Sequence, residues 1–292
     1  MRLLGAIPDA LAKTSYRGVF VYSRAGRMNV MRVVHRWKNG KMQERIAQLD
    51  GQMGEILRDG NNVIYILPGN QAINLEQGAP GGHFAKTEIA EGMNESLYHI
   101  SVLGQERVAG HDVVQLLVQA RDDFRYSYQL WVEKATNMPL KSVMLDDSGA
   151  TLDSYQFTQI EFGPEISDEE LEPQVKGTLL SHRYKTDEPS NDQELNWRLD
   201  WVPNGFAQKG SFRREDISGG KYMDSVVFSD GLASFTIFVE PESGQSIPEG
   251  GGSMGATTAY TIIHKGMVIT VVGEVPAVTA MKVAESLRFL NN

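Results

Sequence analysis

The chain has 292 residues, a formal net charge of −9, 41% hydrophobic residues and 22% charged residues. This length accommodates two domains of ordinary size, and the composition is that of a soluble globular protein without the ~18-residue apolar run of a membrane span. A protein this acidic is not expected to bind nucleic acid, because such binding normally needs a basic face. The absence of cysteine excludes disulfide bonds and Cys-ligated metals, and permits an oxidising compartment without indicating one.

The first hundred residues predict one helix followed by strands. Leu4, Ile7 and Leu11 lie at helical spacing, so residues 2–13 are expected to form a short amphipathic helix on a sheet edge. Expected strands then cover residues 16–24, 28–37, 41–49, 53–58, 63–67 and 98–108, with hairpin signals at Ala25-Gly26 and Asn39-Gly40. Residues 76–95 have little periodicity and are expected to form a long loop or a broken helix.

Residues 110–160 alternate apolar and polar side chains over several strand lengths. Such a period of two predicts strands with one buried and one solvated face. The buried parity carries Leu116 and Val118, and then Tyr126, Tyr128 and Leu130 after a turn. The other parity of the second run, from Arg125 through Trp131 to Glu133, is expected to face water. Four strands with short links predict an antiparallel meander, whose apolar face must be covered by chain or by ligand.

An acidic, Pro-flanked segment follows Phe162 and predicts a domain boundary. The expected units are a first domain of residues 1–162, a linker of 163–178 and a second domain of 179–292. In the second domain, residues 183–195 are expected to be exposed and Gly244–Gly255 to be a flexible excursion. Expected strands cover 197–202, 206–213, 225–229, 234–240, 257–264 and 267–272, before a helix that begins at Pro276 and includes Leu287.

The sequence contains no recognisable catalytic set. There is no P-loop, no G-x-S-x-G motif and no H-E-x-x-H motif, and the six histidines are scattered without metal-ligand spacing. We therefore predict no catalytic residue, no metal site and no cofactor. Arg213-Arg214, at the end of an expected strand, is a pair suited to carboxylate or phosphate groups. A solvated strand end is the alternative interpretation of this pair.

Several short motifs resemble the RseB/MucB family of periplasmic regulators of an envelope-stress sigma factor. In the first domain they are residues 15–22 (SYRGVFVY), 48–51 (QLDG) with Glu55, Arg58 and Gly60, Arg125-Tyr126 through Trp131 to 139–141 (PLK), and Leu145-Asp146 with Gly149, Gln156 and Phe157. In the second domain they are 201–206 (WVPNGF), Arg213-Arg214, 229–235 (SDGLASF) and 272–276 (VGEVP). Their order over both domains makes the resemblance specific, and residues 76–97 and 241–256 match least.

The resemblance implies a mainly β (α+β) fold. The first domain is expected to be an open antiparallel β half-barrel with covering helices, similar to lipoprotein carriers, and the second a smaller antiparallel sheet with a helix. The family binds the periplasmic segment of a membrane anti-sigma factor, protects it from regulated proteolysis, and is released by lipid or lipopolysaccharide. The implied location is the periplasm. The family has a secretory leader that this chain lacks, and we take that leader as removed. A homodimer is left open.

Two binding sites follow from these interpretations. A lipid site is expected on the concave face of the first sheet, where an apolar pocket would bury most of a ligand; its candidates are Trp37, Tyr65, Leu116, Val118, Tyr126, Tyr128 and Leu130. A partner site is expected on the second domain and its groove with the first, with candidates Arg213, Arg214, Phe228 and Phe238. The alternative functions are a periplasmic lipid or lipoprotein carrier without a regulatory role, which would not need the second domain, and a periplasmic enzyme.

Overall fold

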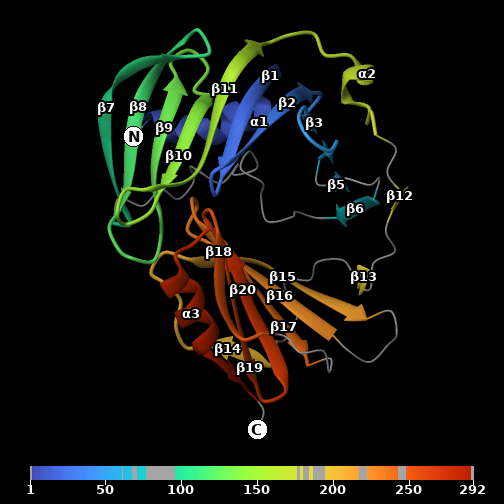
Figure 1. The fold of residues 1–292 in the computed structure, drawn as a ribbon, viewed down its shortest axis with the longest axis vertical. Helices are drawn as coiled ribbons and strands as arrows, with labels where there is room; N and C mark the ends of the chain where they lie inside the picture. Colours follow the sequence, from blue (N-terminus) through green and yellow to red (C-terminus); the bar gives the residue numbers. More distant parts are fainter. Residues whose placement is uncertain are drawn as a thin grey trace.

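The structure is a computed structural model that describes residues 2–60, 62–67, 71–76, 96–175, 178–179, 184–186, 195–216, 222–242 and 248–290. The loop expected at 76–95 and the exposed segment expected at 183–195 lie mostly outside the described residues. Figure 1 shows two β-rich units stacked one above the other, with the chain running from the upper to the lower unit.

The upper unit is a 12-stranded sheet with the order β12-β6-β5-β4-β3-β2-β1-β11-β10-β9-β8-β7. Neighbouring strands are antiparallel except for the short β12, which is parallel to β6. Within the described chain the end strands β7 and β12 do not pair with each other, so the sheet is open, and the expected half-barrel is confirmed. The strands are β1 (Tyr16–Arg24), β2 (Arg27–Lys38), β3 (Lys41–Gln48), β4 (Glu55–Asp59), β5 (Asn62–Leu67), β6 (Gln71–Glu76), β7 (Tyr98–Val108), β8 (His111–Ala120), β9 (Ser127–Glu133), β10 (Pro139–Leu145), β11 (Thr151–Phe162) and β12 (Thr178–Leu179).

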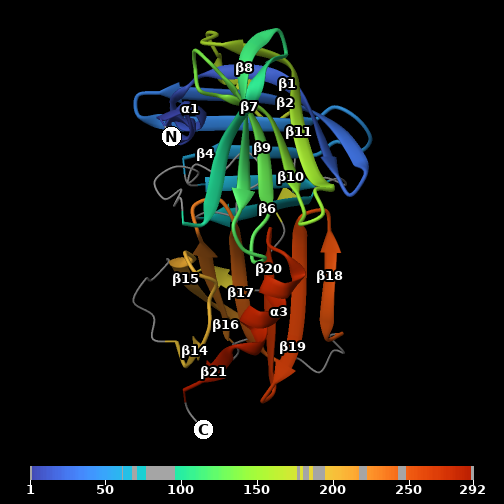
Figure 2. The same cartoon turned by 90° about the vertical axis from the view of Figure 1, so that its left-hand side faces the viewer.

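Helix α1 (Arg2–Lys13) covers the apolar face of this sheet. Its buried face, which includes Leu4, Ile7 and Leu11, belongs to one core cluster with Phe20 and Phe157 of the sheet. Figure 2 shows the two halves of the sheet lying across one another, with α1 beside them. The apolar stripe at i, i+3 and i+7 therefore forms this helix because the curled sheet offers a matching apolar surface.

Two hairpin turns form where the sequence predicted them. Asn39 and Gly40 have φ values of 55° and 76°, and Ala25 and Gly26 have 47° and 75°. Positive φ at both central residues is the geometry of a type I′ turn, whose twist matches that of the flanking strands. These turns fix the register of β1 to β3.

Part of the face of β9 that was expected to be exposed to solvent is buried. Trp131 and Glu133 were expected to face water, but they are only 4% and 7% exposed. Trp131 Nε1 donates to Glu106 at 2.8 Å and Lys141 lies over its ring, while Glu133 accepts hydrogen bonds from the turn at Thr136. Long side chains from neighbouring strands thus cover the β9 side chains that the alternating pattern alone assigned to solvent.

Residues 163–175 of the expected linker lie along the outer face of the first sheet, opposite α1, and residue 178 at the linker's end belongs to β12 of the same sheet. Here α2 (Asp168–Leu171) forms one helical turn. Arg36 pairs with Asp168 at 2.6 Å, and Glu55 accepts a hydrogen bond from the Gln174 backbone at 3.0 Å. Val175 packs with Ile66 in a small apolar cluster. We call residues 163–175 the connector.

The lower unit is a seven-stranded sheet with the order β13-β15-β16-β17-β20-β19-β18, packed against α3 (Ala277–Glu285). Its strands are β13 (Tyr184–Thr186), β15 (Ala207–Asp216), β16 (Tyr222–Ser229), β17 (Ser234–Pro241), β18 (Gly250–Met254), β19 (Thr257–His264) and β20 (Met267–Gly273). A separate pair, β14 (Trp197–Leu199) and β21 (Leu287–Phe289), completes it.

Two predictions for this unit are wrong in detail. Gly250–Met254 is an edge strand paired with β19, although its glycines predicted a flexible excursion; the preceding residues 243–247 lie outside the described part. Leu287 follows α3 and belongs to β21, although it is buried as expected. In both places pairing with a neighbouring strand outweighs local propensity.

One cross-strand row on the apolar face of the first sheet is polar. It runs from Tyr16 through His35 and Glu44 to Arg58. His35 is 1% exposed, and neither ring nitrogen has a hydrogen-bond partner among the described residues. Burial, and then the charge of Arg58, lower the pKa of His35 to about 4. Burial raises the pKa of Glu44 against the opposing effect of Arg58.

We predict that His35 makes the protein less stable in acid. Between pH 6.5 and about 4 the unfolded chain binds a proton at His35 that the folded chain does not, so stability present above pH 6.5 is lost as the pH falls through this window. The loss amounts to about 3 kcal/mol. Urea denaturation from pH 7 to pH 4 should show a smaller loss in His35→Phe, while the exposed-site control His99→Gln follows the wild type. Identical pH dependence in His35→Phe and wild type would contradict this assignment.

Candidate functional site

The junction between the two units is built around the buried guanidinium of Arg125, which precedes β9. Arg125 Nη1 pairs with Asp230 of the second unit at 2.5 Å, and both side chains are fully buried. Arg125 Nη2 donates to the Asn204 carbonyl at 2.6 Å, and Nε donates to Asp122 at 2.9 Å. Tyr98 also donates to Asp230, at 2.8 Å.

The surroundings of Arg125 keep its guanidinium charged. Burial alone would lower the pKa of Arg125, but the hydrogen bond to Asp122 and the charge of Asp230 outweigh it, so the pKa is raised. Burial, and then the charge of Asp230, raise the pKa of Tyr98 well above its ordinary value. Tyr98 therefore remains a hydroxyl donor over the accessible pH range.

A second contact centres on Asp153 of β11, whose side chain is completely buried. It pairs with Arg24 at 3.2 Å and accepts a hydrogen bond from the backbone of Ala256 in the second unit at 3.3 Å. A Cβ added at Gly255 would lie 1.9 Å from the Asp153 carboxylate. Gly255 is therefore required both by its positive φ of 59° and by this close approach.

Hydrogen bonds and apolar packing continue between these two contacts. Tyr126 donates to the Val275 carbonyl at 3.2 Å, and Thr279 at the start of α3 donates to the Phe124 carbonyl at 2.9 Å. Leu232 and Ala256 of the second unit belong to the core cluster of the first. The second unit has a core of its own, and Leu232 and Ala256 extend the core of the first unit across the junction.

The expected lipid-site residues lie on one face of the first sheet. Register places Tyr65 beside Ile56 and thus on the α1 side, where it and Trp37 are half-buried. The other five are between 0% and 8% exposed and belong to the core cluster that α1 completes: Leu116, Val118, Tyr126, Tyr128 and Leu130. In this structure, chain rather than ligand covers the face.

The expected partner-site residues are not brought together. Arg213 is held by Asp224 through two hydrogen bonds of 2.6 and 3.0 Å, which raise its pKa. Phe228 stacks on Phe235 with ring centroids 5.4 Å apart, on the core face of the second sheet. Phe238 pairs with Ser225 and therefore lies on the opposite face, half-buried. The side chain of Arg214 lies outside the described residues.

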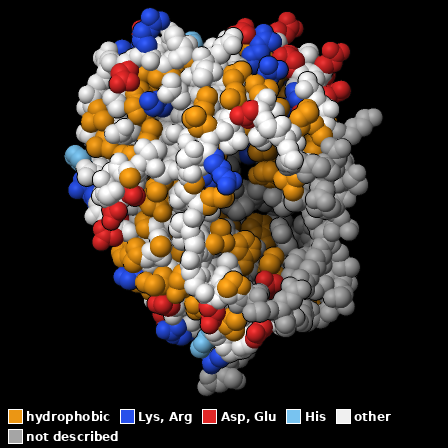
Figure 3. Space-filling model, viewed as in Figure 1, with side chains coloured by type: hydrophobic (Ala, Val, Ile, Leu, Met, Phe, Trp, Pro, Cys, Tyr) orange, Lys and Arg blue, Asp and Glu red, His pale blue; other side chains and the backbone are white. Residues whose placement is uncertain are grey.

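The structure reveals an apolar surface that sequence reasoning missed. Met28 near the start of β2, and Leu49 and Met53 between β3 and β4, are 71%, 45% and 55% exposed, and the strand register places them at the same end of the sheet as the β1–β2 turn. Arg24, at that same end, lies 4.0 Å from Glu274. Met254 of β18 is 57% exposed next to the Gly255 contact. Figure 3 shows a hollow between the two units with hydrophobic side chains in its walls.

Methionine near turns was the available signal for this surface, because turns are exposed and a flexible thioether suits adaptable contacts. Among the described residues, no group of three or more His, Asp or Glu side chains could hold a metal ion. No helix in the described part is long and apolar enough to cross a membrane. The contacts at the junction are apolar packing, hydrogen bonds and ion pairs.

These features define a binding protein made of an open β-sheet unit and a sheet-and-helix unit that share a buried junction. Comparison with known proteins identifies the family: residues 1–175 match the MucB/RseB N-terminal domain and residues 191–288 the MucB/RseB C-terminal domain. The chain belongs to the MucB/RseB family.

Relatives of known name match almost the whole chain. The sigma factor AlgU regulatory protein MucB of Pseudomonas aeruginosa is 33% identical, covering 98% of this chain and 89% of that protein. The sigma-E factor regulatory protein RseB of Haemophilus influenzae is 28% identical, covering 98% and 90%. A crystal structure of MucB in complex with MucA(peri) and a complex structure of Pseudomonas aeruginosa MucA/MucB are each 28% identical, with TM-scores of 0.73 and 0.75, and each match covers 100% of this chain and 99% of that chain.

We predict that neutralising Asp230 strongly destabilises the protein. Asp230→Asn keeps the acceptor for the Leu232 and Ala233 backbone amides and removes the charge that balances Arg125. Loss of one partner of a buried ion pair typically costs about 3 kcal/mol or more. The free energy of unfolding in urea should fall accordingly, while Asp200→Asn, whose ion pair is solvent-exposed, should cost less than ~1 kcal/mol. Equal effects of the two substitutions would show that the junction does not depend on this pair.

Proposed function

We propose that this chain is a periplasmic negative regulator of an envelope-stress sigma-factor pathway, and that it binds the periplasmic segment of a membrane anti-sigma factor. The observation that carries this proposal is the match over both domains to relatives named as sigma-factor regulatory proteins, together with relatives solved as MucA/MucB complexes. While bound, the chain protects the segment from regulated proteolysis. The function is one of binding and not of catalysis.

The hollow between the units supports the placement of the peptide site there and on the adjoining second unit. Hydrophobic side chains lie in its walls (Figure 3), and the exposed methionines Met28 and Met53 of the first unit and Met254 of the second are our candidates for its apolar anchors. Peptide interfaces are centred on such apolar anchors, and polar side chains at the rim add specificity. Arg214 and the half-buried Phe238 remain candidates on the second sheet.

A lipid or lipopolysaccharide ligand would release the partner by occupying the α1-covered face of the first sheet. Such a ligand must displace α1 or separate it from the sheet, because Ile7 and Leu11 fill this face in the structure. Tyr126 belongs to the same core and hydrogen-bonds to Val275 of the second unit. Lipid entry would therefore disturb the junction and lower the affinity for the partner. Release requires such a difference in affinity between the lipid-free and the lipid-bound protein.

The second unit supports the regulatory role over a simple carrier role. A carrier needs only the open sheet, whereas here Asp230, Leu232 and Ala256 make the second unit part of the first core. This dependence of one unit on the other provides a physical connection between a lipid face and a peptide site.

The partner site can be tested by calorimetric titration of the anti-sigma periplasmic segment into the full chain. We expect Met53→Ser combined with Met254→Ser to weaken binding about 30-fold, the effect of losing a central anchor of ~2 kcal/mol. Arg213→Ala/Arg214→Ala tests the arginine pair, and Arg198→Ala is an exposed control in the same unit. Unchanged affinity in the methionine variant removes the hollow from the site, and unchanged affinity in the arginine variant removes the pair.

The lipid site can be tested by creating space beneath α1. Ile7→Ala removes apolar volume from a fully buried position and should cost about 2–5 kcal/mol in stability. We expect it to increase binding of a fluorescent acyl-chain probe, while Tyr128→Glu weakens binding and Asp9→Ala, on the exposed side of α1, leaves it unchanged. Absence of probe binding in both wild type and folded Ile7→Ala would show that this face does not take lipid.

A further inference from the structure

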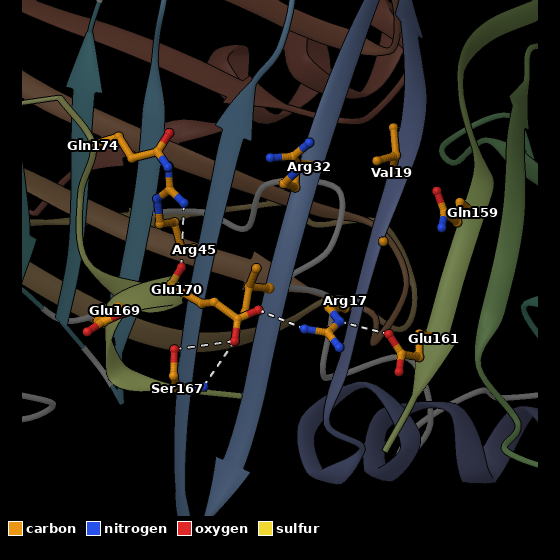
Figure 4. Close-up of a pocket in the computed structure, with 12 residues that line it drawn as sticks. Arg17, Val19, Arg32, Arg45, Gln159, Glu161, Ser167, Glu169, Glu170 and Gln174 are labelled. Carbon is orange, nitrogen blue, oxygen red and sulfur yellow. Dashed lines mark hydrogen bonds and ion pairs between the residues drawn. The ribbon is translucent and has the colours of Figure 1, made fainter. Parts of the chain in front are cut away.

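The outer face of the first sheet carries a cavity of about 450 Å³ beside the connector. Strands β11, β1, β2 and β3 form its floor, and connector residues from Ser167 to Gln174 form one side (Figure 4). Arg17 and Val19 line it, and they alternate along β1 with Tyr16 and Phe20, which belong to the core. This outer-face cavity therefore lies on the side of the sheet opposite the proposed lipid face.

Three arginines line the outer-face cavity, and they differ in how their charge is balanced. Arg17 pairs with Glu161 at 2.7 Å and with Glu170 at 3.0 Å. Arg45 pairs with the buried Glu55. Arg32 is exposed and has no hydrogen bond or ion pair with any of the described residues, and Figure 4 shows it free of dashed lines beside Arg45.

The connector shows what this arginine surface binds. It is an acidic stretch of the chain, and its side chains and carbonyls contact the arginines of the outer face. Asp168 pairs with Arg36, Glu170 pairs with Arg17, and the Glu170 carbonyl accepts a hydrogen bond from Arg45 at 3.5 Å. The guanidinium fork suits carboxylates. The cavity lies beside the connector, and Glu161, Glu169 and Glu170 line it together with the three arginines.

We propose that the outer-face cavity binds a second acidic peptide segment, with the Arg32 guanidinium taking a carboxylate of that segment. Gln159 and Gln174, which also line the cavity, supply amide donors and acceptors for its backbone. The volume suits two or three residues, because ligand pockets of ~300–1,000 Å³ hold small molecules of that size. This site does not depend on the regulatory function proposed above.

Binding of a fluorescein-labelled Gly-Glu-Glu-Gly peptide to the full chain, followed by fluorescence anisotropy at ~0.15 M salt, tests the proposal. We expect Arg32→Gln to weaken binding about tenfold or more, since a charge-assisted hydrogen bond is lost, and Arg32→Lys to have a smaller effect. The matched control is Arg27→Gln, an exposed arginine of the same strand on the opposite face. A Gly-Gln-Gln-Gly peptide should not bind measurably, and inorganic phosphate should compete at least tenfold less well than unlabelled acidic peptide.

Each alternative outcome overturns part of this assignment. Equal binding by wild type and Arg32→Gln, with circular dichroism showing both folded, would remove Arg32 and the cavity from the site. An equal loss of peptide binding in Arg27→Gln would show that the effect of Arg32→Gln comes from the change in net charge. Phosphate competing as well as the peptide, with the same dependence on Arg32, would make this a site for free oxyanions and not for peptides.

Discussion

The structure of this protein depends on the buried ion pair between Arg125 and Asp230. A guanidinium without access to water is tolerable only when its charge is balanced and its donors are satisfied. Asp230 of the second unit balances the charge of Arg125, and Asp122 and the Asn204 carbonyl accept its other hydrogen bonds. Because the two halves of this pair come from different units, removing either partner while the units stay docked would leave the other charge buried and uncompensated.

The two faces of the first sheet are stabilised by different physical effects. On one face, α1 and the strands bury a continuous apolar core, to which Leu232 and Ala256 of the second unit contribute. On the other, the connector is held through ion pairs such as Arg36–Asp168 and Arg17–Glu170. Partly exposed ion pairs are screened by salt, whereas apolar burial involves no charge that salt could screen. The attachment of the connector is therefore the more responsive of the two to solution conditions.

The release mechanism proposed above requires two sites and a physical connection between them. The two proposed sites are the α1-covered face and the hollow between the units (Figure 3). Tyr98 and Tyr126 take part in both regions, because their rings are buried in the first core and their hydroxyls donate to the second unit. The junction thus has the features expected of such a connection.

The sequence by itself determined the local structure: the I′ turn at Asn39-Gly40, the amphipathic α1, and the alternation that placed Leu116 and Tyr128 in the core. Through its motifs it also indicated the family, and with it the open sheet. The tertiary structure alone decided that Arg125 and Asp230 meet, that Arg213 is bound by Asp224, that Trp131 is covered, and that Met28 and Met53 remain exposed. Periodicity and turn chemistry act over a few neighbouring residues, whereas these outcomes depend on strand register and domain docking between residues far apart in the chain.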